Sequence, residues 1–242
     1  MLRIVIKLFI VCLLLNPLIA VSTEHQAESA SSNTVIMLHG LGRSAFAMWY
    51  LDKKLTDAGF TVHNLDYPSR ALPPDELLGY ISRLIDECCG AIQGKVHFVG
   101  HSLGGLLVRA YLQNPRVQPA RVVLLGTPNN GSELADTFAH TLWFEKLLGP
   151  TAQLLGTEAH NFPHSLSDPD YELGIIAGNK SINPVGSWII PGVDDGMVSV
   201  ASTRLEGMSD FIILPTDHVL MRYDSEVSEQ TVHFLKTGQF KR

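Results

Sequence analysis

Six short apolar runs alternate with longer amphipathic stretches along this chain, and this alternation restricts the fold more than any other feature. The runs occupy residues 34–40, 60–68, 96–100, 121–126, 172–178 and 211–215. They are continuous rather than alternating in polarity, which is typical of strands buried on both faces of a sheet. Strands that are separated by helices form parallel sheets with the helices on both faces. The sequence therefore predicts an α/β fold with about six mostly parallel core strands.

The amphipathic stretches predict the helices and one insertion. Helical spacing of apolar residues occurs at 47–59, 74–92, 102–112 and 225–236. The interval between the fourth and fifth runs is too long for a simple crossover, and it holds a further amphipathic stretch at 134–149. We expect a small helical cap over one edge of the sheet at about 133–170. Two ordinary surface helices are the alternative.

The N-terminal segment has the composition of a secretory signal. Arg3 and Lys7 precede an apolar run at 8–15, and small residues follow. The whole apolar stretch is shorter than the roughly 20 residues that a membrane-spanning helix needs. We expect a signal peptide at 1–22, a disordered leader at 23–33 and a single domain at 34–242. The domain is predicted to be exported, either to the periplasm or out of the cell; an uncleaved N-terminal anchor is the alternative.

Composition limits the classes of partner. The chain has 242 residues, of which 45% are hydrophobic, enough for one sizeable core. Its formal net charge is −6 with both signs interspersed, so we expect no nucleic-acid partner. Cys12 lies in the predicted signal, and Cys88 and Cys89 are neighbours, so the mature chain allows no long-range disulfide. We expect the adjacent pair to serve packing rather than redox chemistry.

The motif GHSLGG points to a chemical function. Ser102 stands between Gly100 and Gly104, directly after one apolar run and before a helical stretch. Such a strand–turn–helix presents the serine at the carboxyl end of the sheet, and glycines are needed where a Cβ atom would collide. A serine hydroxyl becomes a nucleophile only beside a base and donors that stabilise an oxyanion. The motif predicts that Ser102 is that nucleophile; a structural loop serine is the alternative.

These residues resemble a known family. A strand followed by GHSLGG, with an earlier strand that ends in His39 and Gly40, is similar to the α/β-hydrolase fold superfamily and to its bacterial lipase- and esterase-like members. The resemblance covers the chain from about residue 33 and is weakest over 133–170. It implies an α/β-hydrolase fold, a nucleophile elbow that includes His101, and a catalytic acid and histidine downstream of Ser102, in that order.

Chain order and position select the other two members of this predicted triad. Among ten histidines, His218 alone lies downstream of Ser102 and directly after the last apolar run, at the carboxyl end of the sheet. Asp194 and Asp195 lie in the preceding interval. The relatives carry an acid followed by glycine and an apolar residue, which matches Asp195 and leaves Asp194 as the alternative. Asp195 would orient His218 and stabilise its protonated ring.

The resemblance also implies an oxyanion hole made of backbone N–H groups, from Leu103 after the nucleophile and from Leu41 after the first strand. The chain departs from its relatives at Asn129, where they frequently have histidine; this position affects packing rather than reaction. Several secreted relatives bind calcium partly through an aspartate just after the catalytic histidine, whereas Val219 follows here. We therefore predict no metal and no cofactor.

A triad determines acyl transfer but leaves the acyl chain open. The prediction is a serine ester hydrolase, an esterase or lipase, that forms an acyl-enzyme on Ser102 with His218 as general base. Its partner would be a small-molecule or lipid ester, with transient contact at a lipid interface. Candidates for an apolar acyl pocket, or equally for the core, are Leu41, Phe46, Met48, Leu103, Phe138, Leu142 and Trp143. The alternatives are an acyltransferase or thioesterase with the same triad, and a non-catalytic binding protein of this fold.

Overall fold

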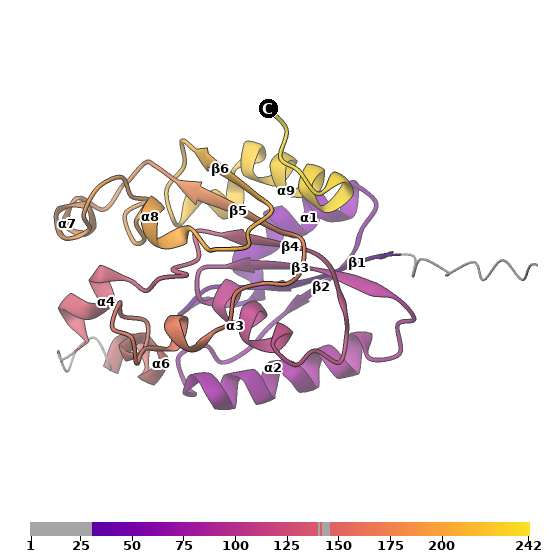
Figure 1. The fold of residues 1–242 in the computed structure, drawn as a ribbon, viewed down its shortest axis with the longest axis horizontal. Helices are drawn as coiled ribbons and strands as arrows, with labels where there is room; N and C mark the ends of the chain where they lie inside the picture. The colour runs from indigo at the N-terminus through magenta and orange to yellow at the C-terminus, as the bar shows by residue number, and fades with distance from the viewer. Residues whose placement is uncertain (1–30, 140, 142–145) are drawn as a thin grey trace, which may run out of the picture.

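The computed structural model describes residues 31–139, 141 and 146–242, and these contain one six-stranded sheet (Figure 1). The strands are β1 (Ser31–Leu38), β2 (Thr61–Leu65), β3 (Lys95–His101), β4 (Pro119–Leu125), β5 (Leu173–Gly178) and β6 (Asp210–Leu214). Their order is β2-β1-β3-β4-β5-β6, and every adjacent pair is parallel. The six predicted runs and the predicted fold class are thereby confirmed.

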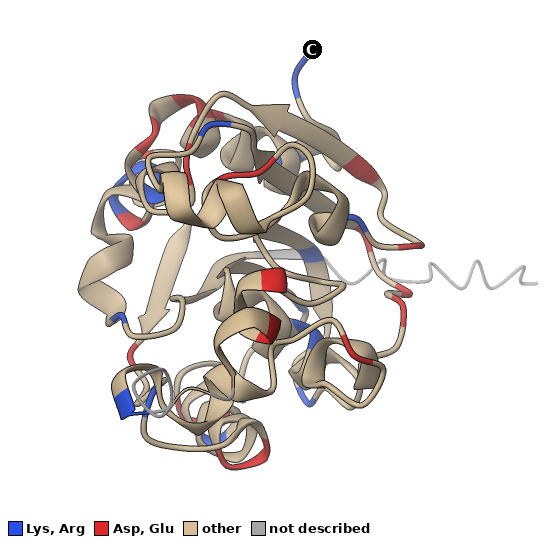
Figure 2. Cartoon of the chain, turned by 90° about the vertical axis from the view of Figure 1, so that its left-hand side faces the viewer, with Lys and Arg blue, Asp and Glu red and all other residues tan. Residues whose placement is uncertain are grey.

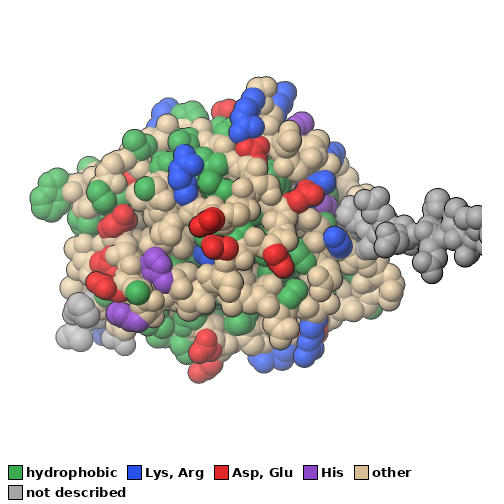
Figure 3. Space-filling view, viewed as in Figure 1, with side chains coloured by type: hydrophobic (Ala, Val, Ile, Leu, Met, Phe, Trp, Pro, Cys, Tyr) green, Lys and Arg blue, Asp and Glu red, His purple; other side chains and the backbone are tan. Residues whose placement is uncertain are grey.

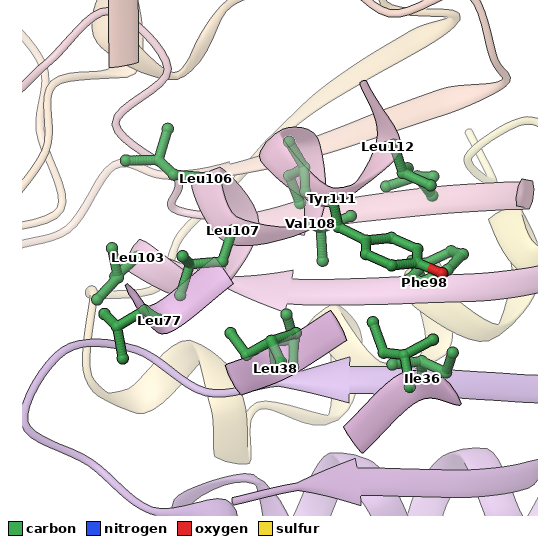
Figure 4. Close-up of a cluster of buried hydrophobic side chains, with 14 of the residues drawn as sticks. Ile36, Leu38, Leu77, Phe98, Leu103, Leu106, Leu107, Val108, Tyr111 and Leu112 are labelled. Carbon is green, nitrogen blue, oxygen red and sulfur yellow. The ribbon is translucent and has the colours of Figure 1, made fainter. Parts of the chain in front are cut away.

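Helices cover both faces of the sheet (Figure 1). The helices α2 (Pro74–Cys89) and α3 (Leu103–Leu112) pack on one face, where Ile36 and Leu38 of β1 point. The helices α1 (Trp49–Asp57) and α9 (Ser225–Thr237) pack on the other, where Val35 and Met37 point. Because successive side chains of a strand alternate between faces, a strand covered on both sides must be apolar throughout. Figure 4 shows the first cluster, with Phe98 of β3 beside Tyr111 of α3.

Short elements gather at the carboxyl edge of the sheet, on the left in Figure 1. They are η1 (Ala45–Met48), α4 (Glu133–Phe138), α6 (Pro150–Gln153), η2 (Phe162–Ser165), α7 (Pro184–Ile189), α8 (Val200–Thr203) and η3 (Leu220–Tyr223). The amphipathic stretch expected at 134–149 is not one continuous helix, since α4 ends at Phe138, residues 139 and 141 are not helical, and residues 146–148 are helical again. The predicted pocket residues Leu142 and Trp143 lie outside the described residues.

The start of the domain differs slightly from the prediction. The strand β1 begins at Ser31, and its backbone pairs there with Lys95 of β3. The last three residues of the expected leader at 23–33 are thus strand, because pairing with β3 extends β1 through polar residues. The predicted signal peptide at 1–22 lies outside the described residues. Within the part that the structure describes, no helix is long and apolar enough to cross a bilayer.

Candidate active site

Ser102 occupies the turn between β3 and α3 with a strained backbone. Its φ of 54° and ψ of −123° make it the one non-glycine residue with positive φ among those described. A Cβ atom on Gly100 would lie 2.5 Å from the Cα of Gly105, and one on Gly104 would overlap the carbonyl oxygen of Leu38. The Ser102 N–H donates to the Leu125 carbonyl at 2.9 Å, which anchors the turn to β4. The serine is therefore held in one position by its surroundings.

Three of the predicted site residues form one hydrogen-bonded chain. The Oγ of Ser102 lies 3.0 Å from Nε2 of His218, and Nδ1 of His218 lies 2.7 Å from Oδ2 of Asp195. The other oxygen of Asp195 accepts the N–H groups of Met197 at 3.0 Å and Val198 at 2.8 Å. The carboxylate is thus fixed by its own loop and faces the histidine ring, which in turn faces the serine.

Asp194 points away from this chain. Its Oδ1 accepts the hydroxyl of Ser187 at 2.6 Å and the N–H of Gly196 at 2.7 Å. These bonds join the acidic loop to α7, so Asp194 has a structural role in holding the loop that carries Asp195.

His101 contacts His218 through both its ring and a hydrogen bond to the backbone. Its Nε2 lies 2.9 Å from the carbonyl oxygen of His218, and the two ring centroids are 4.9 Å apart. Burial lowers the pKa of His101 well below its usual value, and the nearby His218 acts in the same direction. A neutral His101 donates from Nε2 to that carbonyl, which fixes the backbone of His218.

His39 holds the loop after β1 in the same way. Its Nδ1 lies 2.9 Å from the Gly40 carbonyl, and its ring stacks on Tyr67 at 4.0 Å. The Tyr67 hydroxyl donates to the His39 carbonyl. Burial lowers the pKa of His39, so its ring stays neutral near neutral pH. This packing sets the course of the chain into Gly40 and Leu41, the segment that faces Ser102.

The alpha/beta hydrolase family matches the chain over residues 35–227, which include the whole hydrogen-bonded chain. The protein belongs to the alpha/beta hydrolase family. A curated relative, a triacylglycerol lipase of Pseudarthrobacter phenanthrenivorans, is 35% identical over 120 residues. That match spans 45% of this chain and 37% of the relative, so it covers little more than a third of the relative's length.

Solved structures show the same fold. The mature lipase BlEst2 of Bacillus licheniformis superimposes with a TM-score of 0.65 at 21% identity, over 89% of this chain and 94% of that one. The phospholipase PlaB of Legionella pneumophila gives a TM-score of 0.67 at 16% identity, over 88% of this chain and 60% of that one. At such identities the likeness establishes the fold alone.

In this alpha/beta hydrolase a cavity of about 200 Å³ opens onto Ser102 and His218. Gly40 and Leu41 line it beside the serine. Apolar side chains from the segment between β4 and β5 form another wall, namely Leu134, Ala135, Leu148, Ala152 and Leu155. The long interval that the sequence sets apart therefore contributes much of the pocket. Figure 2 looks onto this edge of the molecule and shows basic and acidic positions interspersed around it.

Several of the expected pocket residues lie elsewhere. Met48 and Leu103 are fully buried in the two core clusters, since each points from a helical turn onto the sheet. Phe138 packs against a core cluster, and Phe46 is 78% exposed on η1. Leu41 alone of the described candidates lines the cavity. Periodicity identifies an apolar face but cannot tell whether that face meets the sheet or a pocket.

One cluster of metal-ligand types occurs among the described residues, away from the pocket. The ligand atoms of His63, Cys88 and Cys89 lie within 4.8 Å of one another. The two sulfurs are joined in a disulfide between neighbouring residues, and Cys89 is also buried in a core cluster. A metal binds cysteine as thiolate, and a disulfide offers none. The cluster in this form therefore lacks the donors for a metal site.

Proposed function

We propose that this alpha/beta hydrolase cleaves carboxylic esters through an acyl-enzyme on Ser102. The observation that carries the proposal is the hydrogen-bonded chain from Ser102 through His218 to Asp195, at the mouth of an apolar cavity. The Ser102 oxygen attacks the ester carbonyl while Nε2 of His218 takes its proton. The same nitrogen returns the proton to the alcohol oxygen as that bond breaks. Water then attacks the acyl-serine by the reverse sequence and releases the acid.

Asp195 and two backbone groups assist this reaction. Asp195 accepts the Nδ1 proton of His218 and stabilises the ring when it becomes positively charged. Leu103 is the first residue of α3, so its N–H has no carbonyl four residues earlier in that helix to bind. We propose that this N–H and that of Leu41 bind the oxyanion. The positive end of the α3 dipole favours negative charge at the same place.

We propose that the substrate has an apolar acyl group and that the protein contacts lipid when it binds this substrate. The relatives are named as a triacylglycerol lipase, a lipase and a phospholipase, and the cavity wall between β4 and β5 is apolar. On α7, Trp188 is 87% exposed, and Ile182 and Val185 beside it are also exposed. Hydrophobic side chains project at the left edge of Figure 3, where Figure 1 places α7. Tryptophan on an exposed apolar projection suits a lipid interface.

Hydrolysis of p-nitrophenyl esters of increasing chain length tests the proposed function. The wild type should turn over, and Ser102→Ala should lose about a million-fold in kcat, as for loss of a serine nucleophile elsewhere. Ser165→Ala is the matched control, because this serine is exposed on η2 and its hydroxyl donates to the nearby Phe162 carbonyl. Retained activity in a folded Ser102→Ala protein would contradict the proposal.

Product analysis with an added alcohol separates the related reactions. A hydrolase releases free acid with or without the alcohol, whereas an acyltransferase makes a new ester. A thioesterase prefers the thioester of the same acyl chain. A binding protein without catalysis gives no product with any of these substrates.

A further inference from the structure

Two arginines line the same cavity as Ser102 and His218. Arg43 lies in the loop after β1, where its N–H donates to the Gly40 carbonyl at 3.3 Å. Arg222 lies in η3, four residues after His218. The cavity therefore has an apolar wall between β4 and β5 and a basic margin formed by these two side chains.

Arg222 is a buried cation that forms no ion pair with any of the residues that the structure describes. It is 2% exposed, and it forms no salt bridge within the described part of the chain. Its Nε donates to the Val219 carbonyl at 3.1 Å and its Nη1 to the Ala47 carbonyl at 3.2 Å. A guanidinium has five N–H donors, so further donors stay available. The carboxylate of Asp217 attracts this guanidinium, but its Oδ1 accepts the N–H groups of Val219 and Leu220.

Arg43 places a second positive charge at this margin. It is exposed, and its guanidinium has neither an ion pair nor a hydrogen bond among the described residues. Burial lowers the pKa of Arg222, and the charge of Arg43 lowers it further, so the two guanidinium groups repel one another. An anion between them would relieve that repulsion and supply the carboxylate or phosphate that neither arginine has.

We propose that Arg43 and Arg222 form an anion-binding subsite for the alcohol portion of the substrate. The preferred substrates are then acyl esters whose alcohol carries a phosphate or a carboxylate. The apolar wall accommodates the acyl chain. The alcohol leaves from the side of His218, which returns its proton, and Arg222 lies four residues after His218, in η3. The inference rests on the proposed ester hydrolysis, and it specifies that the alcohol portion of the preferred ester is negatively charged.

Two pairs of esters test the inference and separate the two anions. The phosphate pair is a short-chain monoacylglycerol and the same acylglycerol with a phosphate on the alcohol. The carboxylate pair is the butanoyl ester of ethylene glycol and that of glycolate. The quantity measured is the ratio of kcat/KM for the anionic member to kcat/KM for the neutral member. We expect a ratio well above one in at least one pair, and that pair identifies the anion.

Arg43→Gln should lower this ratio about tenfold or more, the effect expected for one charge-assisted hydrogen bond. Arg43→Lys keeps the charge and should retain part of the preference. Arg70→Gln is the matched control, because Arg70 lies near Gly42 and bonds to the Leu147 carbonyl but does not line the cavity. The control should leave the ratio unchanged, since it removes a charge from the same region but not from the subsite.

The outcomes distinguish this inference from the proposed function. Neutral esters cleaved by Ser102 with a ratio near one in both pairs would overturn the subsite and leave the hydrolase intact. An anionic preference that survives Arg43→Gln, or that falls equally in Arg70→Gln, would also overturn it. Absence of hydrolysis of all four esters would overturn the proposed function itself. The ionic strength gives a second readout. Added salt that shortens the Debye length from about 30 Å to about 3 Å should lower the preference for the anionic ester.

Discussion

Asp194 and Asp195 are adjacent carboxylates with different neighbours, so the same substitution at each should have different effects. Asp195→Asn keeps the shape of the side chain and one oxygen to accept the N–H groups of Met197 and Val198. It then turns an amide N–H₂ toward Nδ1 of His218, where the carboxylate now lies at 2.7 Å. His218 must present a lone pair at Nδ1 and carry its proton on Nε2, which is the wrong tautomer for accepting the proton of Ser102.

The expected loss for Asp195→Asn is about ten-thousand-fold in kcat, as in a comparable serine hydrolase triad. That loss corresponds to about 5 kcal/mol of transition-state stabilisation. Asp194→Asn changes the hydrogen bonds to Ser187, which lies on α7, and to Gly196, which lies in the acidic loop. Loss of such bonds costs about 1–3 kcal/mol of folding free energy and should change kcat by about tenfold at most.

The assay pairs steady-state hydrolysis of a p-nitrophenyl ester with thermal unfolding for both variants. We expect a low kcat with a nearly unchanged Tm for Asp195→Asn, and the opposite pattern for Asp194→Asn. A larger kcat loss in Asp194→Asn than in Asp195→Asn would refute the reasoning about the tautomer of His218.

Three further predictions concern other parts of the molecule. Gly104→Ala should destabilise the fold by about 1–3 kcal/mol and lower activity, because the new Cβ atom would overlap the Leu38 carbonyl. Chemical denaturation measures the loss of stability, and an unchanged denaturation midpoint would contradict the prediction. Burial lowers the pKa of His97 to about 4, so the unfolded chain binds more protons than the folded chain between about pH 6.5 and 4. The free energy of unfolding should therefore fall by up to about 3 kcal/mol on acidification through this range. His97→Gln should flatten this pH dependence, and an equally steep dependence in the variant would contradict the prediction. Trp188→Ser should weaken binding to phospholipid vesicles, measured by co-sedimentation, by about tenfold relative to the wild type. Equal binding by the variant would exclude α7 from the proposed contact with lipid.

The central strands could be predicted because they are buried on both faces and are therefore largely apolar, as in β3 and β5. The edge strands β2 and β6 are only partly buried, and their runs were found from β-type composition between helical stretches. Short elements gave no such signal. The helix α7 has six residues and α8 has four, too few for a helical period. They are held by side-chain caps instead: Asn183 accepts the N–H of Gly186, and Ser199 accepts that of Ser202. Local hydrogen bonds of this kind depend on geometry that a polar loop sequence does not reveal.

The site was predictable in part. Ser102 and His218 follow from motif and chain order, but two adjacent aspartates cannot be separated by order, and the choice of Asp195 depended on the resemblance. Arg43 and Arg222 carried no signal, because an arginine in a loop is common and only the fold brings the two to one cavity. Asn129 was expected to affect packing, and its side chain joins Arg109 to the Thr203 carbonyl.

The identity of the nucleophile is tested most directly by mapping the adduct of a fluorophosphonate. The wild type should gain one equivalent of label, and tandem mass spectrometry of the digest should locate it on Ser102. The Ser102→Ala protein, folded by circular dichroism, should gain none. A label on a different residue, or ester turnover in a protein whose Ser102 stays unmodified, would contradict the account.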